Sequence, residues 1–508
     1  MSALDRDPER VPIRQLSTGV PGLDEILGGG LPEYSFNIIA GAPGCGKTTL
    51  AHQIMFANAT VERPALYFPV LGEPAIKMLR YQQQYNFFDS VKLDGAIRFV
   101  NLSQLVLDSD LGTVLAAIVK EVEASNASVV VVDSFRTVVR KAQGQSSEVE
   151  LQGFVQSLAL HLTSWQATTF LIGEYVEGEL RDNPVFTVAD GLLWLYQCVE
   201  RNSIVRKMQV MKLRGQESVP GLHTFRITQS GLQTFPRTFG LTHSPTHVKG
   251  RRRLSSGNAG LDAMMGGGIP EGDSLLVAGP SGAGKTVLGI QFIAEGLKCG
   301  EPGIVAMFEE LPDEFLQRAA SFGIDLQKSR DDGSLKIIYL RPLDLSVDET
   351  VHEVVNAVKA IGCKRLVIDS LVGFELALAP GFRTDFRESL YRMIGALTRM
   401  GVTILSTVEI EEDFTSMSLS NFAVSFLADD LLRLRYVSIN GQMRKMLLVI
   451  KMRHSGHSID LREYRITSEG LVLGAPLRGY QGLTSSIPGP WSADDAARLS
   501  AEYAEGQP

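Results

Sequence analysis

Two segments of the chain have the residue types and the spacing that bind the phosphates of a nucleotide. Residues 279–286 read G-P-S-G-A-G-K-T and residues 41–48 read G-A-P-G-C-G-K-T, so both match the pattern G-x-x-x-x-G-K-[ST]. In such a loop the glycines let backbone N–H groups close around the phosphates, and the helix N-terminus adds positive potential. A chance glycine-rich turn is the alternative, but each segment follows an apolar run and precedes a helix-like run, as the motif requires.

The residues of the two loops have expected roles in binding ATP. The lysines, Lys47 and Lys285, reach the β- and γ-phosphates, and the hydroxyl groups of Thr48 and Thr286 hold Mg²⁺. The predicted ATP-binding residues of the loops are Gly41, Pro43, Gly44, Cys45, Gly46, Lys47, Thr48 and Thr49 in the first half, and Gly279, Ser281, Gly282, Ala283, Gly284, Lys285, Thr286 and Val287 in the second.

An ATPase also needs an acid after an apolar strand to organise Mg²⁺ and water. Asp133 follows four valines in the first half, and Asp369 follows a Leu-Val-Ile run in the second. We expect Asp133 to hold Mg²⁺ together with Thr48. In the second half the predicted magnesium ligands are Asp369, Thr286 and Glu310.

Two adjacent carboxylates, Glu309 and Glu310, end an apolar run of the second half. Neighbouring acids raise each other's pKa, which suits a general base that orients or deprotonates an attacking water. We therefore predict that this pair is catalytic together with Lys285. A solvated glutamate pair at the end of a strand is the alternative interpretation.

The first half differs at the position of this pair. Alignment of Pro74 with Pro312 places a Leu-Gly dipeptide, residues 71–72, opposite the two glutamates, and the nearest acid, Glu73, comes one residue late. Glu174, after the apolar run 168–173, is a candidate to compensate. The first half therefore keeps the residues that bind nucleotide and loses the pair expected to activate water.

The two halves repeat one another over their whole length. The offset is 238 residues between the loop lysines (285 − 47) and between the leucines of their leaders (254 − 16), and it is 239 between the Ile-Thr pairs near their ends (466 − 227). So constant an offset indicates tandem duplication. Apolar runs alternate with helical stretches in each half, which predicts two α/β domains, each a mostly parallel sheet flanked by helices with its ligand at the carboxyl ends of the strands.

The composition shifts along the chain predict five segments. They are a polar leader (1–15), a first domain (16–235), a linker (236–253), a second domain (254–473) and a Gly-, Pro- and Ser-rich flexible tail (474–508). The linker ends in a basic cluster, residues 249–253, which could contact nucleic acid, although a solvated linker is the favoured interpretation.

The overall composition excludes several classes of protein. The chain has 508 residues, of which 44% are apolar and 21% charged, and no apolar run is long enough to span a bilayer. The N-terminus lacks the core of a signal peptide, and the four cysteines lie far apart without a C-x-x-C pair, so we expect a cytoplasmic protein with reduced thiols. A net charge of −8 gives no electrostatic reason to expect a nucleic-acid partner.

A pair of cations follows a strongly apolar run in each half: Lys212 and Arg214 in the first, Lys451 and Arg453 in the second. At this spacing on a strand, both charges lie on one face. The pair is either a solvated face or a phosphate clamp that a neighbouring subunit supplies.

In combination, these motifs resemble the KaiC family of two-domain, RecA-like ATPases and autokinases of bacterial clocks. The resemblance rests on the two phosphate loops, the repeated Gly-Leu-Asp and Gly-Gly-Gly leaders, Phe308-Glu309-Glu310 and the two Lys-x-Arg strands, and it covers residues 16–471. It implies a homohexamer with ATP at the subunit interfaces. The residues that the resemblance adds to the ATP site are Lys212, Leu213 and Arg214, and Lys451, Met452 and Arg453, with Lys451 and Arg453 catalytic, Phe322 near the adenine and Lys445 as a weaker candidate for the same interface.

The chain departs from the family at the phosphorylation site of the second domain. The family has an adjacent Ser-Thr pair, whereas alignment on residues 436–443 places Ser425 and Phe426 there. Ordered phosphorylation of two sites is therefore not expected, and Ser425 remains the single candidate acceptor; an ordinary helix or loop serine is the alternative.

Three functions are compatible with the sequence. The favoured one is a KaiC-like ATPase, with serine/threonine autokinase activity as a further hypothesis, that acts on signalling partners the sequence does not identify. The second is a RecA- or RadA-like DNA-binding ATPase, which the net charge of −8 disfavours. The third is a nucleotide-gated scaffold with little catalysis, which the altered first half favours for half of the protein.

Overall fold

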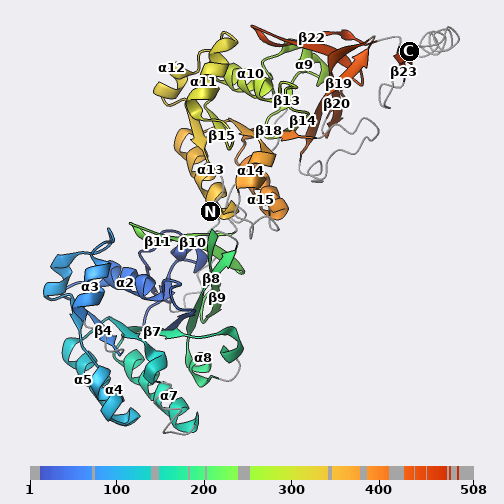
Figure 1. Cartoon of the computed structure of the whole chain (residues 1–508). Helices are drawn as coiled ribbons and strands as arrows, with labels where there is room; N and C mark the ends of the chain where they lie inside the picture. The colour runs from blue at the N-terminus through green and yellow to red at the C-terminus, as the bar shows by residue number, and fades with distance from the viewer. Residues whose placement is uncertain are drawn as a thin grey trace. The chain divides into compact units, whose positions relative to one another are not determined.

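The computed structural model describes residues 12–70, 75–138, 148–180, 183–200, 203–237, 252–340, 346–377, 386–410, 428–439, 441–453, 455–477, 480–481 and 489–490. The chain divides into two compact units, Met1–Arg237 and Thr238–Pro508 (Figure 1).

The first unit alternates strands and helices up to its last four strands. Its strands are β1 (Gln15–Leu16), β2 (Leu31–Pro32), β3 (Phe36–Gly41), β4 (Ala65–Pro69), β5 (Ile97–Phe99), β6 (Val129–Asp133), β7 (Thr168–Glu174), β8 (Gly191–Glu200), β9 (Ser203–Leu213), β10 (Leu222–Thr228) and β11 (Gly231–Phe235). Its helices are α1 (Leu23–Ile26), α2 (Lys47–Asn58), α3 (Ala75–Gln82), η1 (Ser90–Asp94), α4 (Ser103–Asp108), α5 (Leu111–Ser125), α7 (Glu148–Ser164), η2 (Glu177–Leu180) and α8 (Pro184–Val188).

The second unit repeats this order. Its strands are β12 (Arg253–Leu254), β13 (Ile269–Pro270), β14 (Ser274–Gly279), β15 (Gly303–Met307), β16 (Leu335–Tyr339), β17 (Arg365–Asp369), β18 (Thr403–Glu409), β19 (Asp430–Ile439), β20 (Gln442–Met452), β21 (Arg462–Thr467), β22 (Gly470–Pro476), β23 (Tyr480–Gln481) and β24 (Gly489–Pro490). Its helices are α9 (Ala259–Met264), α10 (Lys285–Lys298), α11 (Pro312–Ser321), α12 (Gln327–Asp331), α13 (Val347–Ile361), α14 (Leu371–Ala377) and α15 (Phe386–Arg399).

Each unit is built on a nine-stranded sheet with the same topology. The orders are β11-β10-β9-β8-β3-β7-β6-β4-β5 and β16-β15-β17-β18-β14-β19-β20-β21-β22. Six strands of each sheet are parallel, whereas β9–β11 and β20–β22 are antiparallel because short connections join them, too short for a crossover helix. This confirms the predicted pair of duplicated, RecA-like α/β domains; the sequence did not predict that three strands of each sheet run antiparallel.

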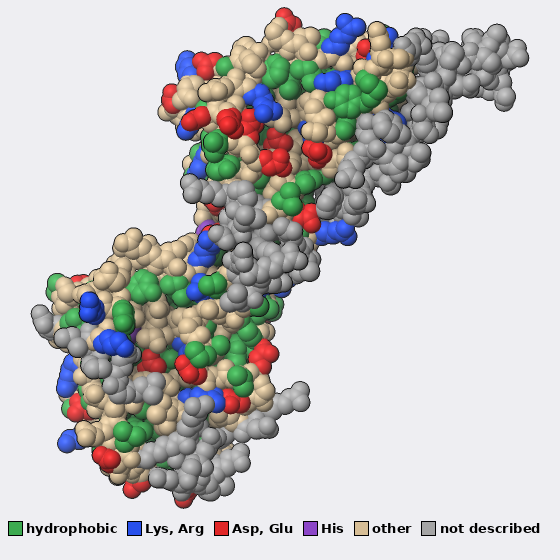
Figure 2. Space-filling model, in the orientation of Figure 1, with side chains coloured by type: hydrophobic (Ala, Val, Ile, Leu, Met, Phe, Trp, Pro, Cys, Tyr) green, Lys and Arg blue, Asp and Glu red, His purple; other side chains and the backbone are tan. Residues whose placement is uncertain are grey.

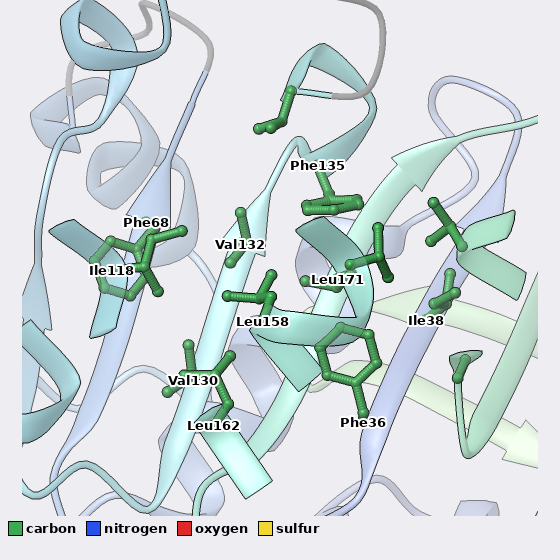
Figure 3. Packing of buried hydrophobic residues seen from close by; sticks show 14 of the residues in the cluster. Phe36, Ile38, Phe68, Ile118, Val130, Val132, Phe135, Leu158, Leu162 and Leu171 are labelled. Carbon is green, nitrogen blue, oxygen red and sulfur yellow. The ribbon is translucent and has the colours of Figure 1, made fainter. Parts of the chain in front are cut away.

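The central strand β6 shows how the sheet of the first unit is buried. Val130 and Val132 face one side, where they pack with Leu158 of α7 and Ile118 of α5 (Figure 3). The other two valines of β6 belong to a second cluster on the opposite face, formed mainly with α2. All four valines are fully buried, as predicted for a parallel strand covered on both faces, and the polar Asp133 comes where the strand ends.

The repeated Gly-Leu-Asp leader has a structural role. Asp24 accepts hydrogen bonds from the Ser17 hydroxyl (2.6 Å) and from the backbone N–H and hydroxyl of Thr18 (2.8 and 2.6 Å). Asp262 binds Ser255 and Ser256 in the same way. The aspartate thus fixes the segment with which each domain begins. This structural role is sufficient to explain why the leader is repeated.

Two surface properties bear on possible partners. No helix in the described part of the chain is long and apolar enough to cross a membrane. On the face shown in Figure 2, the described acidic and basic side chains are interspersed, without an extended basic area over either unit.

Candidate nucleotide-binding sites

The first phosphate loop connects β3 to α2 and is shaped by its last glycine. Gly46 caps α2 with φ 101°, and a Cβ at this position would lie 2.6 Å from the Cδ1 of Ile227. Only glycine adopts this backbone without strain or a clash. The buried Lys47 donates hydrogen bonds to the carbonyls of Gly41 (3.0 Å) and Ala42 (2.7 Å), so its ammonium group lies inside the curve of the loop where phosphates bind.

The acid predicted to organise Mg²⁺ in the first unit lies against this loop. Oδ2 of Asp133 accepts hydrogen bonds from the Thr48 hydroxyl (2.8 Å) and from the Tyr67 hydroxyl (2.7 Å). Burial raises the pKa of Asp133, the hydrogen bonds from Tyr67 and Thr48 oppose that rise, and the carboxylate of Glu174 adds to it. Because the Thr48 proton points to Asp133, the lone pairs of its oxygen are free for a cation, so these two residues fit a magnesium ion.

A cavity of about 560 Å³ opens beside the loop of the first unit. Its volume lies within the usual range for small-molecule sites. The residues that line it are Gly44, Gly46, Lys47, Thr48, Thr49, Tyr67, Pro69, Met78, Tyr85, Asp133, Ser134, Ile172, Gly173, Glu174, Arg206 and Ile227. Five of the predicted loop residues, from Gly44 to Thr49, and Asp133 therefore share one cavity with Glu174, the acid considered as a substitute for the missing pair.

The cavity is also lined by Tyr67, Tyr85 and Arg206, which the sequence did not predict as site residues. Tyr85 stacks on Phe87 with 5.2 Å between ring centroids, which leaves an aromatic surface next to the cavity. The repeat offset could have revealed it, because the position 238 residues before Phe322 is 84, one residue before Tyr85. Tyr67 carried no signal because it lies in a strand that is buried throughout, and Arg206 carried none because it lies in β9 beside other polar residues, Lys207 and Gln209.

The second phosphate loop has the same backbone design, between β14 and α10. Gly284 caps α10 with φ 97°, and a Cβ there would lie 2.8 Å from Ile466. Lys285 donates to the carbonyls of Gly279 (2.9 Å) and Pro280 (2.8 Å), and its Nζ lies 3.8 Å from Oε2 of Glu409. Burial lowers the pKa of Lys285, and the carboxylates of Glu409, Asp369 and Glu309 oppose this.

Side chains from β19, β20 and β21 hold the outer side of the second loop. Lys445 donates to the carbonyl of Gly282 (2.9 Å), the Tyr436 hydroxyl lies 3.4 Å from the carbonyl of Ser281, and the Tyr464 hydroxyl donates to Ala283. Lys445, considered as a residue for a subunit interface, thus contacts the loop of its own domain. Burial lowers its pKa.

The acids of the second site do not act on one another as expected. Glu309 accepts a hydrogen bond from Ser370 (3.1 Å), whereas Glu310 pairs with Arg318 (2.9 Å), so the two carboxylates have different partners. The pKa of Glu310 is raised, but the main cause is burial; Arg318 opposes the rise, and Asp369 and Glu314 add to it. The prediction that the adjacent pair raises its own pKa is therefore wrong for Glu310, because the side chains diverge.

The acid predicted to bind Mg²⁺ in the second unit, Asp369, is held differently from Asp133 in the first. Asp369 accepts a hydrogen bond at Oδ1 from the Thr407 hydroxyl of the neighbouring strand β18. Thr286 lies half-buried in the first turn of α10, and Asp369 is half-buried at the end of β17. Hydroxyl and carboxylate oxygens are the ligands that Mg²⁺ prefers, so Thr286 and Asp369 also fit this ion.

The cation pairs lie at the end of each sheet where the parallel strands begin, and the phosphate loop lies at the opposite end of those strands. Leu213 pairs with Gly191 at the start of β8, whereas Gly41 lies beside Leu195, and four residues of strand span about 13 Å. Lys212 donates to the carbonyl of Thr187 (3.0 Å). Burial, followed by the charge of Arg214, lowers the pKa of this lysine.

The second pair is held in the same way as the first. Arg214 pairs with Asp190 (3.2 Å), and Arg453 pairs with Asp429 (3.1 Å). Lys451 donates to the carbonyl of Ala428 (2.7 Å). Met452 is buried at the end of β20, where its register partner is Asp430 at the start of β19. These cations are thus fixed by their own domain and lie away from its phosphate loop.

The remaining predicted residues divide into three groups. Pro43 and Ser281 are exposed on the loops, while Cys45, Ala283 and Val287 are buried beneath them. Phe322 follows α11 and packs, half-buried, against the core of the second unit. Ser425, Phe426 and Glu73 lie outside the described residues, as do residues 71–72.

Taken together, the fold and the sites define a protein of two tandem P-loop nucleotide-binding domains. The family model described as "ATPase: KaiC" matches residues 16–238 and again residues 254–478. The chain therefore belongs to the KaiC family of ATPases, whose members bind ATP.

Curated relatives resemble the chain over nearly its whole length. It is 29% identical to the circadian clock oscillator protein KaiC 1 of a Synechocystis species, over 97% of this chain and 95% of the relative. It is 28% identical to the circadian clock oscillator protein KaiC of a Picosynechococcus species, over 96% of this chain and 95% of that protein. The circadian clock protein KaiC3 of Synechocystis is 27% identical, over 98% and 99%.

Proposed function

We propose that this protein is an ATP-hydrolysing regulator that assembles into a homohexamer with ATP at the subunit interfaces. The observation that carries the proposal is the position of the two cation pairs. Arg214 and Arg453 lie at the sheet edge opposite the phosphate loop of their own domain, and both are held there by an aspartate. A residue so placed serves a nucleotide only if that nucleotide belongs to another subunit, as an arginine supplied in trans does.

The two domains have different roles in this proposal. The first domain binds ATP and retains it, because its loop, Thr48 and Asp133 surround a cavity that has lost the glutamate pair. The second domain hydrolyses ATP. Lys285 positions the phosphates, and Glu310 or Glu309 accepts the proton of the attacking water.

Mg²⁺, bound by Thr286 and Asp369, would neutralise charge that develops on the phosphates. Arg318 keeps Glu310 oriented through their 2.9 Å ion pair, and the hydroxyl of Ser370 does the same for Glu309. The carboxylate that faces the γ-phosphate in the assembled site is the base. Glu309 and Glu310 are therefore both candidates for the general base, and each has a side chain that positions it.

Serine/threonine autokinase activity is the second part of the proposal. A serine hydroxyl and a water are both weak nucleophiles that need a base, so the glutamates of the second site suit either. Ser425 is the acceptor that the family resemblance suggests. The hexamer would act on signalling proteins, and no single partner is assigned.

One reaction tests both parts. Purified protein is incubated with Mg·ATP, and phosphate release and intact mass are measured for the parent chain, Glu309→Gln with Glu310→Gln, and Ser425→Ala. We expect the double glutamine variant to lose most phosphate release. We also expect the parent chain to gain a single phosphate that Ser425→Ala lacks.

Full phosphate release by the double glutamine variant would contradict the role of the pair. Active hydrolysis without a phosphate on any serine or threonine would contradict the autokinase part alone. A parent chain that neither binds nor hydrolyses ATP would contradict the whole proposal, and binding without hydrolysis would favour a nucleotide-gated scaffold.

A further inference from the structure

Three buried polar side chains of the first unit lie close to one another, and one of them, Tyr67, is hydrogen-bonded to Asp133, the acid predicted to bind Mg²⁺. His52 of α2 and Tyr67 of β4 are each 1% exposed, and Gln82 at the end of α3 is 6% exposed. The rings of His52 and Tyr67 have centroids 4.6 Å apart, and Tyr67 also packs against Phe99 at 5.4 Å. These contacts fix the ring of Tyr67, so its hydroxyl has a defined direction.

The second unit has apolar side chains at all three equivalent positions. The 238-residue offset places Ile290 at the position of His52, Val305 at that of Tyr67 and Ala320 at that of Gln82. Sheet register confirms the central equivalence, because Tyr67 pairs with the third residue of β6 and Val305 with the third residue of β17. The polar cluster is therefore a feature in which the two nucleotide sites differ.

The hydroxyl of Tyr67 connects this cluster to the metal site. It donates to Oδ2 of Asp133 at 2.7 Å, and the Thr48 hydroxyl donates to the same oxygen at 2.8 Å. Two donors on one oxygen fix the rotation of the carboxylate and leave Oδ1 for other ligands. Tyr67 also lines the cavity that contains Lys47 and Asp133, so its hydroxyl lies at the site itself.

We propose that Tyr67 is a positioning residue for the magnesium ion that accompanies ATP in the first domain. This inference rests on the proposed function, in which that domain binds Mg·ATP. With Asp133 fixed by two donors and Thr48 turned toward it, the metal ligands adopt one arrangement before the ion arrives, and preorganised ligands bind more tightly. The second domain fixes Asp369 from the other side, through Thr407 at Oδ1.

The test compares ATP binding with and without the metal. Equilibrium dialysis with labelled ATP is carried out in excess Mg²⁺ and in EDTA, on full-length protein that carries Lys285→Ala to weaken the second site. We expect Tyr67→Phe, which keeps the ring and its packing, to weaken binding of ATP about tenfold in Mg²⁺, the size expected for one hydrogen bond to a charged group. Binding in EDTA should change by less than about twofold.

Tyr85→Phe is the matched control, because this tyrosine lines the same cavity. Its ratio of affinities with and without Mg²⁺ should equal that of the parent. A double-mutant cycle with Asp133→Asn adds a second readout, since Tyr67→Phe should have little further effect once the carboxylate is gone.

Four results would overturn the inference. An affinity of Tyr67→Phe for ATP in Mg²⁺ equal to that of the parent would show that the hydroxyl does not position the metal site. An equal loss in both buffers, or an equal loss in the Asp133→Asn background, would assign Tyr67 a purely structural role. A parent chain that binds no ATP in either buffer would overturn the proposed function as well, so the two failures are distinguishable.

Discussion

The two nucleotide sites share a phosphate loop and differ in how they hold their acids. In the first unit, Asp133 accepts from the loop residue Thr48 and from Tyr67 on one oxygen. In the second, Asp369 accepts from Thr407 on the neighbouring strand, at its other oxygen. The geometry of the phosphate loop is therefore independent of the contacts that hold the acid. A duplicated domain can change those contacts while it keeps the loop.

The charged groups around the loop lysine also differ between the two sites. Lys285 lies 3.8 Å from Glu409, and Asp369 and Glu309 also act on its charge. The described residues of the first cavity include Asp133 and Glu174 as acids, with Arg206 and Lys47 as cations. Three carboxylates thus act on the charge of Lys285 in the second site, whereas acidic and basic side chains are equal in number in the lining of the first cavity.

The largest effect on ATP turnover is expected from the arginines that lie at the strand ends opposite the phosphate loops. Arg453→Ala should lower ATP turnover by roughly 10³-fold, because an arginine supplied in trans offsets charge that develops on the transferred phosphate. Arg214→Ala is the matched change in the first unit, where little turnover is expected, so it should act mainly on assembly. Phosphate release by the two variants, measured at concentrations where the parent is assembled, checks this.

Equal turnover in Arg453→Ala and the parent would contradict the interface site. An equal loss in the two variants, at concentrations where both are assembled, would contradict the division of roles, because the first unit would then contribute as much hydrolysis as the second.

A smaller effect is expected from the loop lysines on assembly. Lys47→Ala should abolish the dependence of the hexamer on ATP, because a ligand that binds only the assembled form stabilises it by mass action. Lys285→Ala should leave most of that dependence intact, since in the proposed function the second unit turns its ATP over. Light scattering of both variants, with and without ATP, measures the difference.

Hexamers of Lys47→Ala that form with and without ATP just as the parent does would contradict the role of the first unit. Loss of assembly in Lys285→Ala alone would reverse the assignment of the two units.

The sequence predicted those parts of the sites that depend on local spacing. A loop between a strand and a helix has few geometries, so Lys47 and Lys285 lie where the motif places them. Asp133 and Asp369 follow from the rule that parallel strands end at one edge. The duplicated fold was predictable for the same reason, since its period is visible without any tertiary contact.

The contacts that distinguish the sites were not predictable. Tyr67 and Asp133 lie 66 residues apart on neighbouring strands, and a tyrosine among core residues has no pattern of its own. The divergence of Glu309 and Glu310 depends on two partners, Ser370 and Arg318, from other elements. Adjacency in the sequence gave no information on side-chain direction, and so the expected cause of the raised pKa of Glu310 was wrong.

The smallest effect concerns Glu409, whose carboxylate competes with phosphate for Lys285. The carboxylate is half-exposed, at 52%, so the 3.8 Å ion pair is well screened and contributes little. Glu409→Gln should therefore raise the ATP affinity of the second site only about two- to fivefold, and the gain should fall as salt is added. Binding isotherms in a Lys47→Ala background measure the second site.

Glu174→Gln in a Lys285→Ala background is the matched control for this comparison. Glu174 occupies the equivalent strand end in the first unit, but it acts on Asp133, whose pKa it raises. Its removal should leave ATP affinity in EDTA unchanged, whereas Glu409→Gln should show its gain in EDTA as well as in Mg²⁺, because the competition is with phosphate. A fall in affinity for Glu409→Gln in Mg²⁺ would instead identify this carboxylate as a ligand of the bound metal or of its water, and it would contradict the competition with phosphate.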